Sequence, residues 1–136
     1  MSISKKTRGY CFLSNRYKKY GTATIIFRSD KTGETLSLCF DDYHITVPFE
    51  PIHAQIQKMK VKEVKAAAGY ARGTHVLPHG FQILEKGFVY FKITDLDKGI
   101  LSLEFKRKEK ICVEYKEIEE LVELARKTEN QLLQKP

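Results

Sequence analysis

The sequence is poor in the residues that mark disordered, disulfide-bonded or membrane-spanning chains. Its 136 residues include only 4 Pro and 8 Gly, and 42% are hydrophobic, so we expect most of the chain to be folded. No apolar run approaches the roughly 20 residues that cross a bilayer, and the basic N-terminus leads into no apolar segment typical of secretory signals. Cys11, Cys39 and Cys112 are odd in number and widely spaced, which argues against a disulfide framework. We therefore expect a cytoplasmic, nucleoid or nuclear protein that is not secreted and binds no membrane.

Motifs that carry catalysis, phosphate binding or metal binding are also missing. No glycine stands in the spacing of a phosphate-binding loop. His75 and His79 flank Pro78, which argues against a helix that would hold both as zinc ligands, so we expect them in a loop or linker. The paired carboxylates at 41–42 and 95–97 fall in predicted turns, where Asp is common. We expect a protein that is not an enzyme and has no metal, cofactor or small-molecule substrate.

The net charge of +7 is spread unevenly along the chain. Residues 1–29 carry seven cations and no acid, further Lys and Arg cluster at 58–65 and 106–110, and acids gather at 114–129. This asymmetry favours a basic face that binds a polyanion. The alternative is a solvated surface that serves solubility alone.

Two stretches of the chain repeat the same strand pattern. Leu36–Phe40 reads LSLCF and Leu101–Phe105 reads LSLEF, with apolar residues at every second position. After a short polar turn, His44–Phe49 and Lys110–Tyr115 alternate in the same way. Each of these strands runs into a helical stripe of apolar residues, and the first helix begins near Pro51, a residue suited to the first helical turn.

These patterns predict an α+β fold built from a duplication. We expect two tandem ββββα units, packed with pseudo-twofold symmetry, as antiparallel sheets with the helices on one side. The single domain spans 1–136, with the first unit at 9–69, a linker at 70–79 and the second unit at 80–134. The first strand of the second unit is expected at 80–84 and its second at 88–93.

The outward strand positions mix aromatic and basic residues. Unpaired bases stack on exposed rings, and each stacked base contributes roughly 1–3 kcal/mol of binding free energy. Cations beside the rings bind the phosphates. This mixture is therefore typical of surfaces that bind single strands. The residues that we expect to bind nucleic acid are Arg16, Tyr17, Lys18, Lys19, Tyr20, Arg28, Phe88, Tyr90, Lys92, Lys106, Arg107 and Lys108.

Two tandem strand-rich units in a basic chain resemble the Whirly, PUR and single-strand-binding transcriptional coactivator group. The resemblance covers nearly the whole chain and rests on the predicted topology and on the LSLxF/ITVxF and LSLxF/ICVxY repeats. It implies paired units that bind single-stranded DNA or RNA on curved sheet faces. The chain lacks a Whirly-type Lys-Gly-Lys-Ala-Ala-Leu stretch, since Lys65–Ala68 stands at a predicted helix end, so no site residue is carried over.

The sequence is compatible with three functions. The first is binding of single-stranded nucleic acid, DNA rather than RNA. The second is a protein-interaction module, in which Phe88 and Tyr90 build a homo-oligomer without nucleic-acid binding. The third is duplex binding through a basic helix at 50–69, where Lys58, Lys62 and Lys65 share a face.

Overall fold

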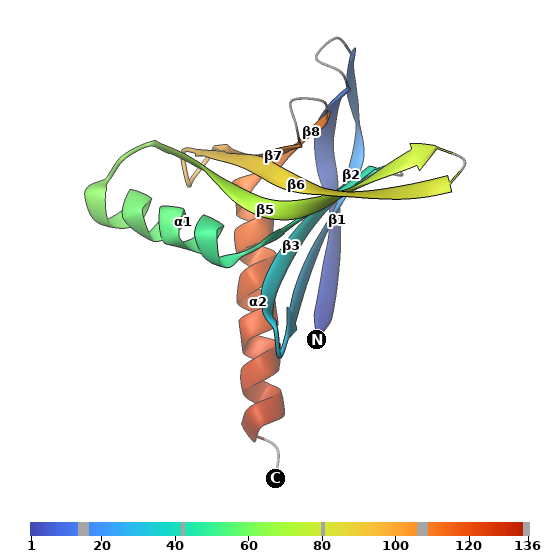
Figure 1. Cartoon of the computed structure of the whole chain (residues 1–136). Helices are drawn as coiled ribbons and strands as arrows, with labels where there is room; N and C mark the ends of the chain where they lie inside the picture. Colours follow the sequence, from blue (N-terminus) through green and yellow to red (C-terminus); the bar gives the residue numbers. More distant parts are fainter. Residues whose placement is uncertain (14–16, 42, 80, 106–108, 135–136) are drawn as a thin grey trace.

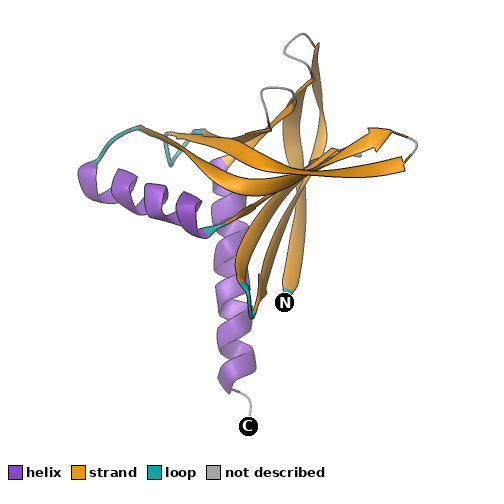
Figure 2. Ribbon diagram, in the orientation of Figure 1, coloured by secondary structure: helices purple, strands orange, loops and turns teal. Residues whose placement is uncertain are grey.

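The chain folds into a closed barrel of eight antiparallel strands with two helices (Figures 1 and 2). The computed structural model describes residues 1–13, 17–41, 43–79, 81–105 and 109–134. The elements in chain order are β1 (Ser2–Leu13), β2 (Tyr17–Asp30), β3 (Gly33–Phe40), β4 (Tyr43–Pro48), α1 (Glu50–Lys62), β5 (Ala66–His79), β6 (Phe81–Thr94), β7 (Ile100–Phe105), β8 (Glu109–Glu114) and α2 (Tyr115–Gln134).

The expected pair of four-stranded sheets with helices on one side is wrong, because the strands join into one barrel. Strand β4 pairs with β5 through Ile45 and His75, and β8 pairs with β1 through Ile111 and Cys11. Each seam provides hydrogen-bond partners for strands that would otherwise be sheet edges, which is a general reason for barrel closure. Alternation predicts which face of a strand is apolar, but it does not indicate which other strands that strand pairs with.

The expected linker at 70–79 is also wrong, since these residues belong to β5. The first helix ends at Lys62 rather than at residue 69, and Glu63 follows it with a left-handed φ of 53°. Likewise, the strands expected at 80–84 and 88–93 are parts of the single strand β6. The segment was misread because Ala67, Gly69 and Ala71, which have small side chains, occupy alternate positions and give no apolar strand pattern.

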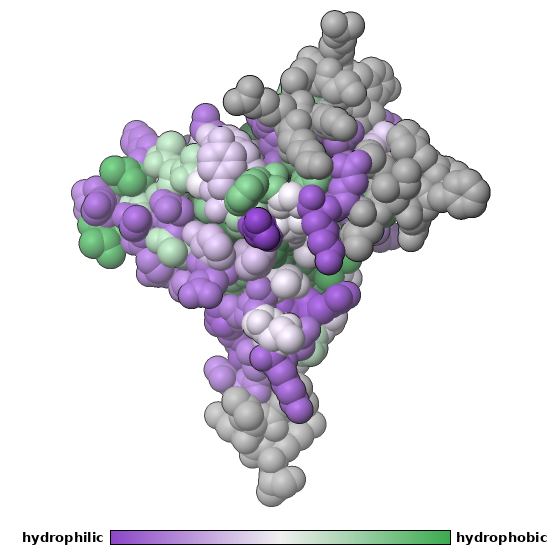
Figure 3. All heavy atoms as spheres, viewed as in Figure 1, coloured by the Kyte–Doolittle hydropathy of each residue, from purple (hydrophilic) through white to green (hydrophobic). Residues whose placement is uncertain are grey.

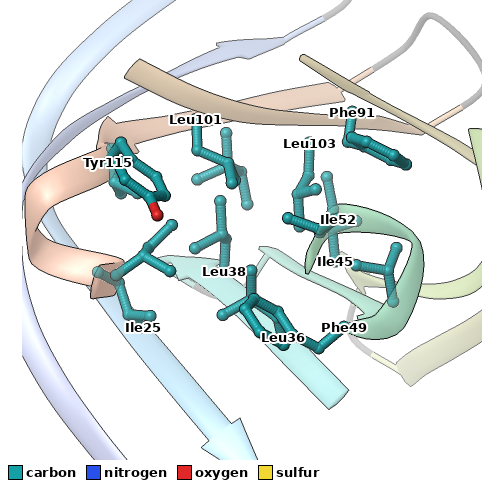
Figure 4. Close-up of a cluster of buried hydrophobic side chains, with 14 of the residues drawn as sticks. Ile25, Leu36, Leu38, Ile45, Phe49, Ile52, Phe91, Leu101, Leu103 and Tyr115 are labelled. Carbon is teal, nitrogen blue, oxygen red and sulfur yellow. The ribbon is translucent and has the colours of Figure 1, made fainter. Parts of the chain in front are cut away.

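Both helices pack on the inner faces of the strands. Apolar residues of α1, such as Ile52 and Ile56, and of α2, such as Ile118 and Leu121, belong to the same buried cluster as the inward strand residues. Figure 4 shows this cluster, in which side chains from β2, β3, β4, β6 and β7 point toward those of α1 and Tyr115. None of the described helices is long and apolar enough to cross a membrane.

Polar contacts hold α2 along the inner side of β1 and β3. The Lys5 ammonium lies 2.6 Å from carboxylate oxygens of both Glu117 and Glu120, and these carboxylates raise the pKa of Lys5. The Arg126 guanidinium donates to both carboxylate oxygens of Glu34, at 2.8 and 3.2 Å. With the helices on the inner side, the outer faces of β5 to β8, β1 and β2 are available to a ligand.

Candidate nucleic-acid interface

The first aromatic cluster lies on the outer face of β5 and β6. It consists of Tyr70, Arg72, Phe88 and Tyr90, and we call it the β5–β6 patch. Tyr70 and Phe88 are 67% and 59% exposed, which is unusual for large aromatic residues. The rings of Tyr70 and Tyr90 are 5.1 Å apart, and the Arg72 guanidinium lies 5.5 Å from the centroid of the Phe88 ring. The patch therefore offers ring faces and a cation to the same ligand.

A second cluster lies on the outer face of β1, β2 and β8. It consists of Tyr10, Phe12, Lys18, Tyr20 and Lys110, and we call it the β1–β2 patch. The Lys18 ammonium lies 4.4 Å from the ring centroid of Tyr10, 5.0 Å from that of Phe12 and 4.8 Å from that of Tyr20. Lys110 lies 5.4 Å from the Phe12 centroid, and the ring of Tyr20 is 68% exposed. Such cation–π contacts hold charge and aromatic surface together.

The strand register joins the two patches into one surface. Across β5, β6, β7, β8, β1 and β2, consecutive register partners form a single row: Tyr70, Tyr90, Glu104, Lys110, Phe12 and Lys18. The neighbouring row on the same face is Ala68, Lys92, Ser102, Cys112, Tyr10 and Tyr20. At roughly 4.8 Å per strand, each row extends over about 24 Å around the barrel. In the second row Ser102 and Cys112 are buried, so the exposed connection between the patches runs along the first row.

Positive charge predominates along these rows. Lys18, Lys92 and Lys110 lie in them, and Arg72 and Arg8 lie beside them on β5 and β1. Arg8 and Arg72 are exposed, as are Lys18 and Lys92. Glu104 faces Lys110 across the β7–β8 pairing and is the acid within the two rows. The surface therefore suits an anionic ligand that also carries flat apolar groups.

The residues predicted from the sequence divide between this surface and other places. Lys18, Tyr20, Phe88, Tyr90 and Lys92 lie on it. Four further predicted residues lie outside the described residues: Arg16, Lys106, Arg107 and Lys108. Tyr17 is described by its backbone alone.

Two predicted residues lie elsewhere in the described structure. Lys19 is on the opposite face of β2, where its ammonium contacts the Asp41 carboxylate at 2.5 Å and lies 6.0 Å from the Phe40 ring. Arg28 is on the outer face but eight residues along β2 from Tyr20, which corresponds to about 27 Å of strand. Neither residue belongs to the two patches or to the rows that join them.

Sequence reasoning missed several residues of the surface. Tyr70 and Arg72 were assigned to the linker, and Tyr10, Phe12 and Lys110 were not selected. The signal for the first two was present, because Tyr70, Arg72 and Thr74 occupy every second position in a strand-like alternation with Ala71 and Gly73. It was hidden because the inward residues are small rather than large and apolar.

A buried polar group occupies the barrel interior. His75, expected in a loop or linker, is fully buried in β5, where its ring stacks on Phe105 at 4.8 Å between centroids. Its Nε2 lies 3.5 Å from the Glu109 carboxylate, and Glu109 is also buried. Among the described residues, no group of three or more His, Cys, Asp or Glu side chains could hold a metal ion.

The three cysteine thiols are buried and held in the protonated form. Burial, followed by the nearby Glu109 carboxylate, raises the pKa of Cys11 to about 12, and burial raises that of Cys112 to about 11. Burial also raises the pKa of Cys39. Because the thiolate is the reactive form, these thiols are poor nucleophiles at neutral pH.

We predict that iodoacetamide at pH 8 leaves all three cysteines unmodified in the folded protein. At a pKa of about 12, on the order of one Cys11 thiol in ten thousand is ionised at pH 8. Mass spectrometry after a timed exposure should show three added groups only when the protein is first unfolded in denaturant. Rapid modification of Cys11 in the folded protein would show that the barrel interior is open to reagent.

Comparison with known proteins returns no match to a protein-family model, to a curated protein or to a solved structure.

Proposed function

We propose that this protein binds single-stranded nucleic acid on the outer surface formed by the β5–β6 and β1–β2 patches, with single-stranded DNA as the first ligand to test. The protein acts as a binding protein and not as an enzyme, without a cofactor, in the cytoplasm or at a nucleoid or nucleus. The resemblance to the Whirly, PUR and transcriptional coactivator group stays a prediction and carries none of the argument.

The observation that carries the proposal is the continuous row from Tyr70 to Lys18. Tyr70 at one end of the row, and Phe12 beside Lys18 at the other, can each stack a base. Stacking contributes roughly 1–3 kcal/mol per base. The cations beside the rings can follow the phosphates between stacked bases. The side chains of Tyr70, Phe88 and Tyr20 are each more than half exposed, and this exposure does not contribute to the stability of the fold.

The same features favour a single strand over a duplex. Bases in a duplex are stacked on one another and present only their edges, so their faces cannot reach the exposed rings. The helix considered for duplex binding is shorter than expected, since α1 ends at Lys62 and leaves Lys65 outside it. Its inner side packs into the barrel core through Ile52, Ile56 and Met59.

We predict tight, salt-dependent binding of an unstructured oligonucleotide. With about five cations near the strand, the logarithm of the affinity should fall against the logarithm of salt concentration with a slope of about −3.5. Fluorescence anisotropy with a labelled single strand measures this, with duplex DNA and heparin as competitors. Absence of binding at low salt, or competition by heparin equal to that of the single strand, would overturn the proposal.

The second candidate is an oligomerisation surface. Exposed Tyr70 and Phe88 are adjacent on β5 and β6, and exposed aromatic residues are also enriched where subunits meet. Light scattering separates the two functions. A Phe88→Ser/Tyr90→Ser variant that lowers the particle mass and leaves oligonucleotide affinity unchanged would favour this candidate.

A further inference from the structure

Two hollows open where a pair of glycines face each other across neighbouring strands. Gly9 is the register partner of Gly21 on β1 and β2, and Gly73 is the partner of Gly87 on β5 and β6. The first hollow has a volume of about 520 Å³ and is lined by Arg8, Gly9, Tyr20, Gly21 and Thr22. The second has a volume of about 400 Å³ and is lined by Arg72, Gly73, Thr74, Lys86, Gly87 and Phe88.

Gly9 on β1 and Gly73 on β5 lie so close to a neighbouring strand that only glycine fits. A Cβ at Gly73 would lie 2.3 Å from the Thr46 carbonyl oxygen, and one at Gly9 would lie 2.7 Å from the Cys112 carbonyl oxygen. Glycine within a strand is typical of places where another backbone, or a ligand, approaches closely. Here the close neighbours are buried residues such as Val89 and Ala23, so these glycines serve strand packing. The glycines also line the hollows.

The two hollows carry the same kinds of groups. In each, an arginine of the first strand is the register partner of a residue of the second strand, Arg8 of Thr22 and Arg72 of Phe88. Each also has a strongly exposed ring, Tyr20 in the first and Phe88 in the second. Each hollow adjoins one of the aromatic patches. A single-stranded nucleic acid that crosses the surface would therefore reach both hollows. Their volumes fall in the range of about 300–1,000 Å³ that is typical of small-ligand pockets.

The charged side chains in these hollows can only donate hydrogen bonds. Guanidinium and ammonium groups have no acceptor, whereas the threonine hydroxyl can either donate or accept. Guanine and thymine present carbonyl oxygens on their reading edges, whereas cytosine and adenine present amino groups at the corresponding positions. Guanine O6 or thymine O4, when it faces the arginine, therefore accepts its hydrogen bond, whereas the adenine or cytosine amino group at the same position would place two donors opposite each other.

We propose that each hollow holds one unstacked base of the bound strand and selects keto bases, guanine and thymine, over amino bases. The base lies against the ring of Tyr20 or Phe88, and its carbonyl oxygen accepts from Arg8 or Arg72. This inference rests on the proposed function and adds base selectivity to it.

The test compares oligo(dT) with oligo(dC) of equal length by fluorescence anisotropy. We expect the wild-type protein to bind oligo(dT) at least about fivefold more tightly, the lower limit for one good base contact. The Arg8→Gln/Arg72→Gln variant should bring this ratio close to one. Lys92→Gln/Lys110→Gln is the control, because it removes the same charge outside the hollows and should weaken both complexes equally. Both arginines are exposed, and matching circular dichroism spectra would establish that each variant folds.

The outcomes separate this inference from the proposed function. If neither oligonucleotide binds, the proposed function fails and the inference fails with it. If both bind equally well to the wild-type protein, the surface binds single strands but the hollows select no base. A preference that survives in Arg8→Gln/Arg72→Gln would assign these arginines to phosphate contacts and overturn the inference.

Discussion

Serine at both Tyr70 and Phe88 should weaken the binding of single-stranded DNA by at least about 30-fold. Each ring can stack one base for roughly 1–3 kcal/mol, so the loss of two stacking sites removes about 2 kcal/mol or more. Both side chains are well exposed, so the substitutions remove little buried surface and the thermal midpoint should stay nearly unchanged. Anisotropy at constant salt measures the affinity, and light scattering on the same samples measures the particle mass.

The chain offers a matched control in Val61 and Leu124, which are 81% and 55% exposed on α1 and α2. Figure 3 shows hydrophobic surface at the left, over the end of α1. Val61 is the last residue but one of this helix. The Val61→Ser/Leu124→Ser variant also removes two exposed apolar side chains, but it removes them from the helices and should bind DNA like the wild-type protein. Equal losses in both double variants would mean that exposed apolar area in general, and not this surface, determines the affinity.

Alanine at Gly73 should destabilise the barrel by about 2–4 kcal/mol, since overpacking against main chain is among the more disruptive substitutions. The added Cβ would lie 2.3 Å from the Thr46 carbonyl oxygen and 2.8 Å from a methyl group of Val89. The carbonyl belongs to the backbone of β4, so relief requires β4 and β5 to separate where Thr46 pairs with Thr74. We expect the thermal midpoint to fall by on the order of 10 °C.

Gly21→Ala is the comparison for this prediction. The three atoms nearest to its Cβ all belong to the ring of Phe40, the closest at 3.2 Å, and a ring can shift where a strand backbone cannot. The loss should therefore be clearly smaller than for Gly73→Ala. Hydrogen exchange locates the effect, because Gly73→Ala should speed exchange at the amides of residues 44–46 and 74–76. A Gly73→Ala protein as stable as the wild type would show that the β4–β5 seam does not hold the barrel closed.

The amino-acid pattern was informative wherever large apolar residues alternate. The alternation in Leu36–Phe40 and Leu101–Phe105 places the inward residues of β3 and β7, and these residues are fully or almost fully buried. The same rule oriented Phe88, Tyr90 and Lys92 outward from β6. It failed for β5, because the inward residues Ala67, Gly69 and Ala71 are small and leave room for larger core side chains of neighbouring strands. Gly69 illustrates this, since a Cβ there would lie 2.8 Å from the ring of Phe91.

Local pattern alone thus determined the apolar faces of most strands, the stripes of both helices and the presence of aromatic and basic residues on an outer face. Barrel closure and the composition of the candidate site were decided by tertiary structure. Phe12 and Tyr90 belong to one row only because β8 pairs with β1 and β7 pairs with β6. Each strand's alternation depends on its own residues, whereas edge pairing depends on the hydrogen-bonding groups of strands far apart in the chain.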